Sequence, residues 1–178
     1  MPKIIENVKE NIIKEGKKLL IKESYKSFSI RDVTTACNIG TGTFYNYFPG
    51  KKELISEIFR FELNELLNSM EGIKLKNISL REKIKEVYNI LNKFLANYIN
   101  IFYEIALINK TAYNHSPHFS QLFFKVSEII ESEKIKQHAV YLDIDSNKLS
   151  QFIVFNIIYI SQNNFMTIDE LCNLINLF

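Results

Sequence analysis

Apolar residues recur every three or four positions along most of the chain, which is the spacing that places them on one side of an α-helix. Residues that break helices are scarce, since only 3 Pro and 5 Gly occur in 178 residues. The pattern predicts an all-α protein with about nine helices. We expect them near residues 4–25, 30–37, 41–48, 51–70, 79–98, 101–113, 117–140, 146–161 and 167–178.

Residues 29–54, SIRDVTTACNIGTGTFYNYFPGKKEL, predict two short helices joined by a tight turn. Ser29 precedes Asp32 by three residues, so its hydroxyl can accept from a free amide at the start of the first helix. Asn38 tolerates the left-handed backbone that a sharp turn requires. Gly40 caps the second helix without a side chain, and Pro49-Gly50 ends it. This arrangement is typical of a helix-turn-helix.

The second of these short helices presents polar but almost uncharged side chains on its outer side. Phe44 and Phe48, four residues apart, are expected to face inward. The outer residues are Thr41, Thr43, Tyr45, Asn46 and Tyr47. Hydroxyls, an amide and phenols suit contacts with base edges and phosphates in the major groove of DNA. An ordinary solvent-exposed helix face is the alternative interpretation.

The segment closely resembles the N-terminal domain of the TetR family of transcriptional regulators. The resemblance rests on residues 29–33 (SIRDV), residues 42–48 (GTFYNYF), and Lys51 followed by Glu53-Leu54. It implies a helix-turn-helix DNA-binding domain in residues 1–50, with a linking helix at 51–70. It also implies a ligand-binding and dimerisation domain in residues 71–178. The implied function is that of a repressor, released from a palindromic operator by a small-molecule inducer.

The resemblance also implies which residues contact DNA. Some of these residues would face the major groove, and others would contact the phosphates or the sugar-phosphate chain. Together they are Arg31, Thr41, Gly42, Thr43, Tyr45, Asn46, Tyr47 and Lys51. Asn38 occupies a position where the family often has Gly, Gly40 one where it often has Ser, and Thr41 one where it often has Lys or Arg. Asn46 replaces a common His, and because Asn can pair with adenine through two hydrogen bonds, an operator that leans toward A·T is plausible.

The net charge of +2 is unevenly distributed along the chain. Residues 1–60 contain 11 Lys or Arg and 7 Asp or Glu, a net charge of +4, whereas residues 61–178 carry −2. A basic N-terminal part on a slightly acidic remainder fits contact with DNA through the N-terminus.

The last two predicted helices are apolar beyond a single stripe. A monomer would expose that surface to water, which is unfavourable for a chain of this size. We therefore expect residues 146–161 and 167–178 to pair with the same helices of a second chain, which makes the protein a homodimer. The TetR resemblance implies the same arrangement. The alternative is that one of the two helices is a fully buried core helix.

Aromatic residues crowd the middle of the chain. At helical spacing they are usually plain core, but the family resemblance favours a pocket for a small apolar or amphipathic inducer. The candidate ligand-binding residues are Tyr98, Phe102, Tyr103, Tyr113, Phe119 and Phe123.

Other kinds of chemistry find little support in the sequence. His115 and His118 lack a nearby third metal ligand, and Cys37 and Cys172 are too far apart in the sequence to suggest a disulfide framework. No phosphate-binding glycine loop or nucleophile motif is present, so we expect no cofactor, no metal and no enzymatic activity. No apolar run is long enough for a membrane span and no secretory signal is evident, so we expect a cytoplasmic protein.

Two alternative functions stay open from the sequence alone. One is a helical small-molecule-binding or protein-interaction module without a DNA role. The other is an enzyme that uses His115 or His118.

Overall fold

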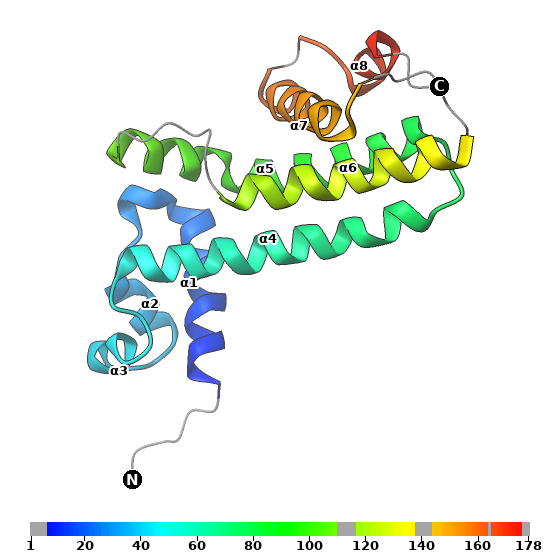
Figure 1. Ribbon diagram of the computed structural model, residues 1–178. Helices are drawn as coiled ribbons and strands as arrows, with labels where there is room; N and C mark the ends of the chain where they lie inside the picture. The colour runs from blue at the N-terminus through cyan, green and yellow to red at the C-terminus, as the bar shows by residue number, and fades with distance from the viewer. Residues whose placement is uncertain (1–6, 110–116, 138–143, 164, 176–178) are drawn as a thin grey trace. The chain divides into compact units, whose positions relative to one another are not determined.

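The computed structural model describes residues 7–109, 117–137, 144–163 and 165–175. These residues form eight helices and no strand, which confirms the all-α prediction (Figure 1). The helices are α1 (Val8–Ser27), α2 (Ile30–Ala36), α3 (Thr41–Tyr45), α4 (Lys51–Leu75), α5 (Leu80–Asn109), α6 (Pro117–Gln137), α7 (Ser146–Gln162) and α8 (Ile168–Leu174).

The chain divides into two compact units by the density of its internal contacts. Unit 1 contains residues 1–63 and 98–111, and unit 2 contains residues 64–97 and 112–178. The first part of α4 and the last part of α5 therefore belong to unit 1, and the remainder of each belongs to unit 2. The boundaries predicted at residues 50 and 70 separate a DNA-binding domain from a ligand-binding domain. The two compact units do not test that division, which stays a prediction.

In unit 1, α1 packs closely against the first half of α4. Gly16 of α1 is buried, and a Cβ atom added to it would lie 3.2 Å from a methyl carbon of Leu54 and 3.3 Å from one of Ile58. Glycine therefore allows the two helices to approach each other. Ile12 and Leu20, one helical turn to either side of Gly16, are fully buried and extend the same contact face.

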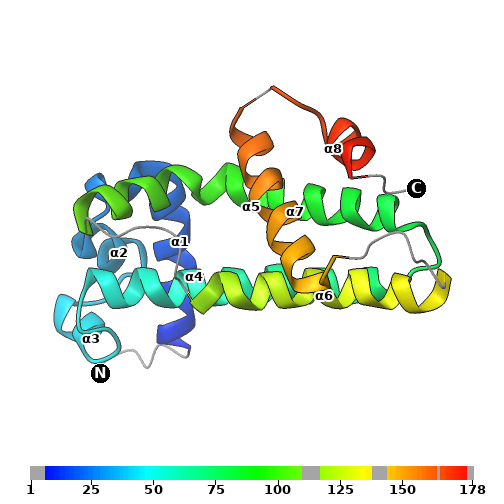
Figure 2. The ribbon, with the colours of Figure 1, turned by 45° about the horizontal axis from the view of Figure 1, so that its top comes forward.

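In unit 2, α7 runs across α6 rather than along it (Figure 2). Its inner face is formed by Leu149, Ile153, Ile157 and Ile160, which are all buried. The spacing of three or four residues is the one expected for a single apolar stripe. Asp145 begins the helix, because its carboxylate accepts hydrogen bonds from the amides of Asn147 and Lys148.

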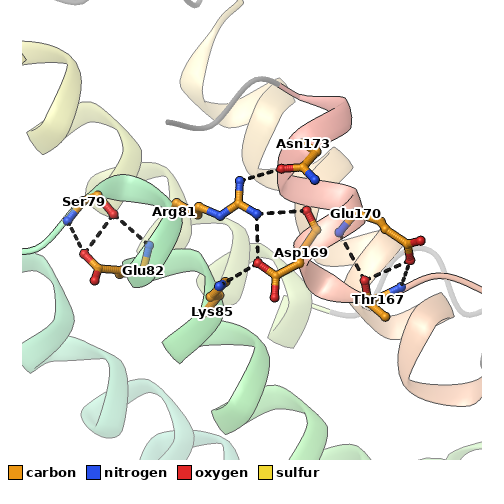
Figure 3. A network of polar contacts seen from close by, with 8 residues as sticks. All are labelled: Ser79, Arg81, Glu82, Lys85, Thr167, Asp169, Glu170 and Asn173. Carbon is orange, nitrogen blue, oxygen red and sulfur yellow. Dashed lines mark hydrogen bonds and ion pairs between the residues drawn. The ribbon is translucent and has the colours of Figure 1, made fainter.

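A polar network joins α8 to the start of α5 within unit 2 (Figure 3). The Arg81 guanidinium donates to the Asp169 carboxylate at 2.8 Å and to the Asn173 side-chain oxygen at 2.7 Å. Lys85 pairs with the same Asp169 carboxylate at 2.6 Å. Both cations lower the pKa of Asp169, so the link persists in its charged form at neutral pH.

Both capping boxes that the sequence contains are formed at the starts of these helices. Thr167 accepts a hydrogen bond from the Glu170 amide at 3.2 Å, and the Glu170 carboxylate accepts from the Thr167 amide at 2.7 Å. Ser79 and Glu82 make the same reciprocal pair before α5.

Several of the predicted helix ends are wrong. The helix expected to reach residue 48 ends at Tyr45, where α3 gives way to a turn. We expected a break between helices at residues 98 and 101, but α5 continues to Asn109. No Gly or Pro lies there, and Tyr98 and Ile101 are both buried, so the helix gains by continuing. We also expected a helix to end at Met70, but α4 continues through Gly72 to Leu75, because burial of Ile73 offsets the weak helix propensity of glycine.

Among the described residues, no helix combines the length and the apolar character that crossing a bilayer requires. The same part of the chain holds no group of three or more His, Cys, Asp or Glu side chains placed to bind a metal ion. His115 lies outside the described residues, and the side chain of His118 is likewise not described.

Candidate nucleic-acid interface

The helix α2 begins as the sequence predicts. The Ser29 hydroxyl accepts a hydrogen bond from the Asp32 amide at 3.2 Å. Phe28, just before the cap, and Val33, in the first turns of α2, are both buried and fix the entry of the chain into the helix. Thr34 and Thr35 turn their hydroxyls back onto the Arg31 carbonyl at 2.9 Å each.

The turn between α2 and α3 depends on Asn38. Its φ is 53°, in the left-handed region that Asn tolerates better than most residues. The Asn38 amide donates to the Thr35 carbonyl at 3.1 Å, and the next amide, of Ile39, donates to the Thr34 carbonyl at 3.0 Å. The end of α2 is thereby capped by backbone groups, and the chain reverses into α3 within a few residues.

The helix α3 has a fully apolar inner side. Phe44 is 0% exposed and Phe48, just beyond the helix, is 4% exposed, and their ring centroids lie 5.8 Å apart. The helix begins without a side-chain cap, as predicted for Gly40, whose carbonyl accepts from the amides of Thr43 and Phe44. These two rings anchor a helix of only five residues, which would not form in isolation.

The outer side of α3 is exposed as the sequence predicts. The Tyr45 side chain is 53% exposed and the Tyr47 side chain is 43% exposed. Thr41, Gly42 and Asn46 are also exposed, and Thr43 is half-buried. The Tyr45 and Phe44 rings pack in a T-shaped arrangement with centroids 5.5 Å apart, which holds the phenol although it is half exposed.

Gly42 has no evident structural reason to be glycine. Its φ is not positive, and a Cβ atom added to it would meet nothing within 4 Å. Glycine in a helix costs roughly 0.5–1 kcal/mol relative to alanine. The residue therefore leaves an open surface at which another molecule can approach the backbone.

The cations around this surface differ in their surroundings. Lys51 donates a hydrogen bond to the Tyr25 carbonyl, and its ammonium lies 4.5 Å from the centre of the Tyr25 ring and 5.6 Å from that of Phe28. Burial lowers the pKa of Lys51, and the nearby Glu104 acts in the opposite direction. Arg31 and Lys52 are exposed, and no carboxylate pairs with either of them in the described part of the chain.

The predicted ligand-binding residues fall in different places. In unit 1, Tyr98 is buried, Phe102 is half-buried, and both rings contact Phe59, with Phe102 stacked on it at 4.6 Å between ring centroids. Tyr103 is 47% exposed. In unit 2, the Phe123 ring packs against Phe155 at 5.3 Å. Tyr113 and the side chain of Phe119 lie outside the described residues.

A groove of about 580 Å³ lies between α4 and α6 within unit 2. It is lined by Asn64, Leu67, Asn68, Glu71, Ser120, Gln121, Phe124 and Lys125. None of these is among the ligand-binding residues predicted from the sequence. One signal was available, because the polar residues Asn64, Asn68 and Glu71 recur at the spacing of one helix face. The Lys125 ammonium bridges the groove by pairing with Glu71 at 2.5 Å.

Comparisons with known proteins agree with this arrangement. Residues 12–58, which include α2 and α3, match the family described as bacterial regulatory proteins, tetR family. An uncharacterised HTH-type transcriptional regulator from Bacillus subtilis, YuxN, is 29% identical over 80 residues, which cover 45% of this chain and 28% of that protein. The chain spans less than half the length of the curated relatives that it matches.

Solved structures of similar fold cover nearly the whole chain. The fatty acid degradation regulator FadR from Bacillus halodurans matches with a TM-score of 0.67 at 17% identity, over 97% of this chain and 94% of that one. FadR from Bacillus subtilis, solved in complex with stearoyl-CoA, matches with a TM-score of 0.65 at 16% identity, over 94% and 95%. Residues 12–58 with their helix-turn-helix thus match the tetR family of bacterial regulatory proteins, and the chain as a whole shares the fold of these solved regulators.

Proposed function

We propose that this protein is a DNA-binding transcriptional regulator, and that it represses transcription from a palindromic operator until a small-molecule inducer releases it. The observation that carries the proposal is the exposed, hydroxyl-rich outer side of α3 on a TetR-type helix-turn-helix. Tyr45 and Tyr47 are large exposed phenols close to Gly42, a glycine that the fold itself does not require. Contact with water alone does not explain such a surface. It is a good surface for contact with a duplex.

Each exposed residue has a role in this proposal. Thr41, Thr43, Tyr45 and Asn46 face the major groove, and Gly42 lets the backbone approach the DNA. Arg31, at the start of α2, approaches the sugar-phosphate chain, and Tyr47 binds a phosphate.

Lys51 is proposed as a second phosphate contact. An ammonium has three N–H donors, and one of them is used by the Tyr25 carbonyl. The others stay available to a phosphate oxygen. The contact with Tyr25 would hold the ammonium in place at the start of α4. Holding it there lowers the entropic cost of binding a phosphate.

A homodimer would supply the second recognition helix that a palindrome requires. Half-sites read by such a dimer lie about 34–36 Å apart. The side of α7 opposite its buried stripe supports pairing of two chains, because Phe152, Phe155 and Tyr159 are each about half exposed. Leu174 of α8 is 69% exposed. Aromatic and aliphatic side chains of this size are expected to be covered in the functional form of the protein.

The inducer is proposed to be a small apolar or amphipathic molecule. Two proteins of similar fold support this class, since one was solved with stearoyl-CoA and another is described as a gamma-butyrolactone receptor. The residues that would bind it are still those predicted from the sequence. The groove between α4 and α6 adds a second possible location, because Leu67 and Phe124 line it together with amides and charged groups.

A protein that regulates bacterial genes through DNA works in the cytoplasm, so we propose that location. The family match does not favour a helical module without a DNA role, and nothing described here supports an enzyme.

The test is selection of bound sequences from random duplex DNA, followed by measurement of affinity against salt concentration. We expect affinity for the selected site to fall steeply as salt rises, because phosphate contacts release counterions. Tyr47→Ala should weaken binding to all sequences about equally if the phenol binds a phosphate, and it should leave the salt slope unchanged because an uncharged phenol releases no counterion. A protein that enriches no sequence and binds no duplex at low salt would contradict the proposal.

A further inference from the structure

We infer that α3 reads A·T rather than G·C base pairs, so that the centre of each operator half-site consists of adenine and thymine. This inference rests on the proposed function and adds the class of sequence that is recognised.

The first step concerns guanine. In the major groove guanine presents two acceptors, N7 and O6, and Arg or Lys donating to both is the commonest base-specific contact. Residues 38–50, from the turn to the start of α4, contain no Arg or Lys. The flanking cations lie on other helices: Arg31 is on α2, and Lys51 and Lys52 begin α4, where the Lys51 ammonium contacts the Tyr25 carbonyl. Recognition of guanine by a bidentate cation is therefore not available on α3.

The second step concerns adenine. Adenine presents an acceptor at N7 beside a donor at N6, and a side-chain amide matches both. Asn46 is exposed at the end of α3, and its backbone amide already donates to carbonyls of the helix. Its side-chain amide makes no hydrogen bond to any residue that the structure describes. A polar group that the fold leaves unused, on the surface proposed to face the groove, is suited to pair with a base.

The third step concerns thymine. An A·T pair also presents the thymine methyl group, which favours apolar contacts. Thr41 and Thr43 each carry a methyl group, and the exposed Tyr45 ring is held by its contact with Phe44. Tyr45 directly precedes Asn46, and Thr43 and Thr41 lie three and five residues before it in the same short segment. They favour a half-site in which adenine and thymine follow one another.

The experiment uses the full-length protein and the sequences it enriches from random duplex DNA. We expect A·T pairs at the central positions of each half-site. Consensus guanines at those positions would overturn the inference while leaving the proposed function intact. Failure to enrich any sequence would instead overturn the proposed function, so the two outcomes are distinguishable.

A base-analogue scan sharpens the test and needs no variant protein. Each adenine of the selected site is replaced in turn by 7-deazaadenine, which lacks only the N7 acceptor. At one adenine per half-site we expect binding to weaken roughly 2- to 13-fold, the value of one hydrogen bond. Weakening by 7-deazaguanine, with no effect of any 7-deazaadenine, would overturn the assignment.

Two substitutions then attribute the effect to Asn46. With Asn46→Ala or Asn46→Asp the same 7-deazaadenine should have no further effect, because the donor to N7 is already absent. Asn97→Ala, an exposed asparagine of α5, is the matched control and should respond to the analogue as the parent protein does. A full analogue effect in both Asn46 variants would show that another residue makes the contact.

Discussion

The Tyr98 hydroxyl donates a hydrogen bond to the Glu62 carboxylate over 2.9 Å, and the Tyr98 side chain is only 1% exposed. Glu62 also pairs with Lys17. The three residues come from α5, α4 and α1, so a single polar cluster connects three helices of unit 1. Burial and the neighbouring carboxylate raise the pKa of Tyr98 well above its usual value, which keeps the phenol protonated as the donor.

The first prediction concerns this hydrogen bond. Tyr98→Phe should lower the free energy of unfolding by roughly 1.5–3 kcal/mol, the range for a hydrogen bond to a charged group. Urea denaturation measures it. Tyr45→Phe removes the hydroxyl of an exposed tyrosine and should change stability by less than about 0.5 kcal/mol. Equal losses in the two variants would show that the bond to Glu62 contributes nothing specific.

The second prediction separates stability from DNA binding at Gly42. Gly42→Ala should raise the free energy of unfolding by roughly 0.4–1 kcal/mol, because the backbone conformation accepts alanine and the added methyl group meets nothing. The same methyl group should weaken operator binding, since Gly42 is proposed to lie where the DNA backbone or a base approaches. Thermal unfolding and fluorescence anisotropy measure the two effects.

Gly72 is the matched control for Gly42. It is also an exposed helical glycine, in α4, with nothing within 4 Å of an added Cβ atom. Gly72→Ala should stabilise the protein by a similar amount and leave operator affinity unchanged. If Gly42→Ala binds DNA as tightly as the parent protein, the assignment of Gly42 to the DNA surface is wrong.

The third prediction concerns the buried ion pair of unit 2. The Lys83 ammonium is fully buried and donates to the Glu133 carboxylate at 2.8 Å and to the Lys74 carbonyl at 2.7 Å. Lys83→Met should cost roughly 3–5 kcal/mol, because it leaves a buried carboxylate without its cation. The double variant Lys83→Met with Glu133→Gln should recover part of that loss. Chemical denaturation gives all the values.

An exposed pair provides the comparison for Lys83. Lys76 pairs with Glu86 at 2.7 Å, but its side chain is 50% exposed. Lys76→Met should cost no more than about 1 kcal/mol, since water screens the attraction. Similar losses for the two lysines would mean that burial of Lys83 has no energetic consequence.

The fourth prediction concerns acid stability. Two hydrogen bonds from Arg60, at 2.8 Å each, lower the pKa of Glu57 from 4.5 to about 2, and Lys9 adds to the effect. A lowered pKa stabilises the fold above the ordinary value of the carboxyl group, and the contribution is lost as pH falls toward 2. Because Arg60 is 58% exposed, we expect no more than about 1 kcal/mol.

Glu57→Gln tests this dependence on pH. The difference in unfolding free energy between the parent protein and Glu57→Gln should be largest above pH 5 and approach zero near pH 2. Glu65→Gln, at an exposed position of the same helix, should give a small difference that does not vary in this way. A difference for Glu57→Gln that stays constant down to pH 2 would contradict the proposed cause.

The helix-turn-helix could be predicted from the sequence because its determinants lie within a few residues of one another. The Ser29 cap, the left-handed Asn38 and the inward pair Phe44 and Phe48 each depend on local spacing. Once Phe44 and Phe48 point inward, Tyr45 at the end of α3 and Tyr47 just beyond it are left on the outside. The surface proposed to meet DNA therefore followed from residues 29–51 alone.

What the sequence did not determine depends on contacts between residues far apart in the chain. The local pattern did not show that α5 continues through residues 98–101, or that α4 continues through Gly72, because burial against other helices decides both. It did not identify the groove between α4 and α6, which requires two helices to lie together. It did not show that Lys83 is buried, since that burial depends on its contacts with the Lys74 carbonyl and with Glu133, 50 residues later. Short-range spacing sets caps, turns and the faces of helices, whereas the packing of distant segments sets where helices end and which charges water no longer reaches.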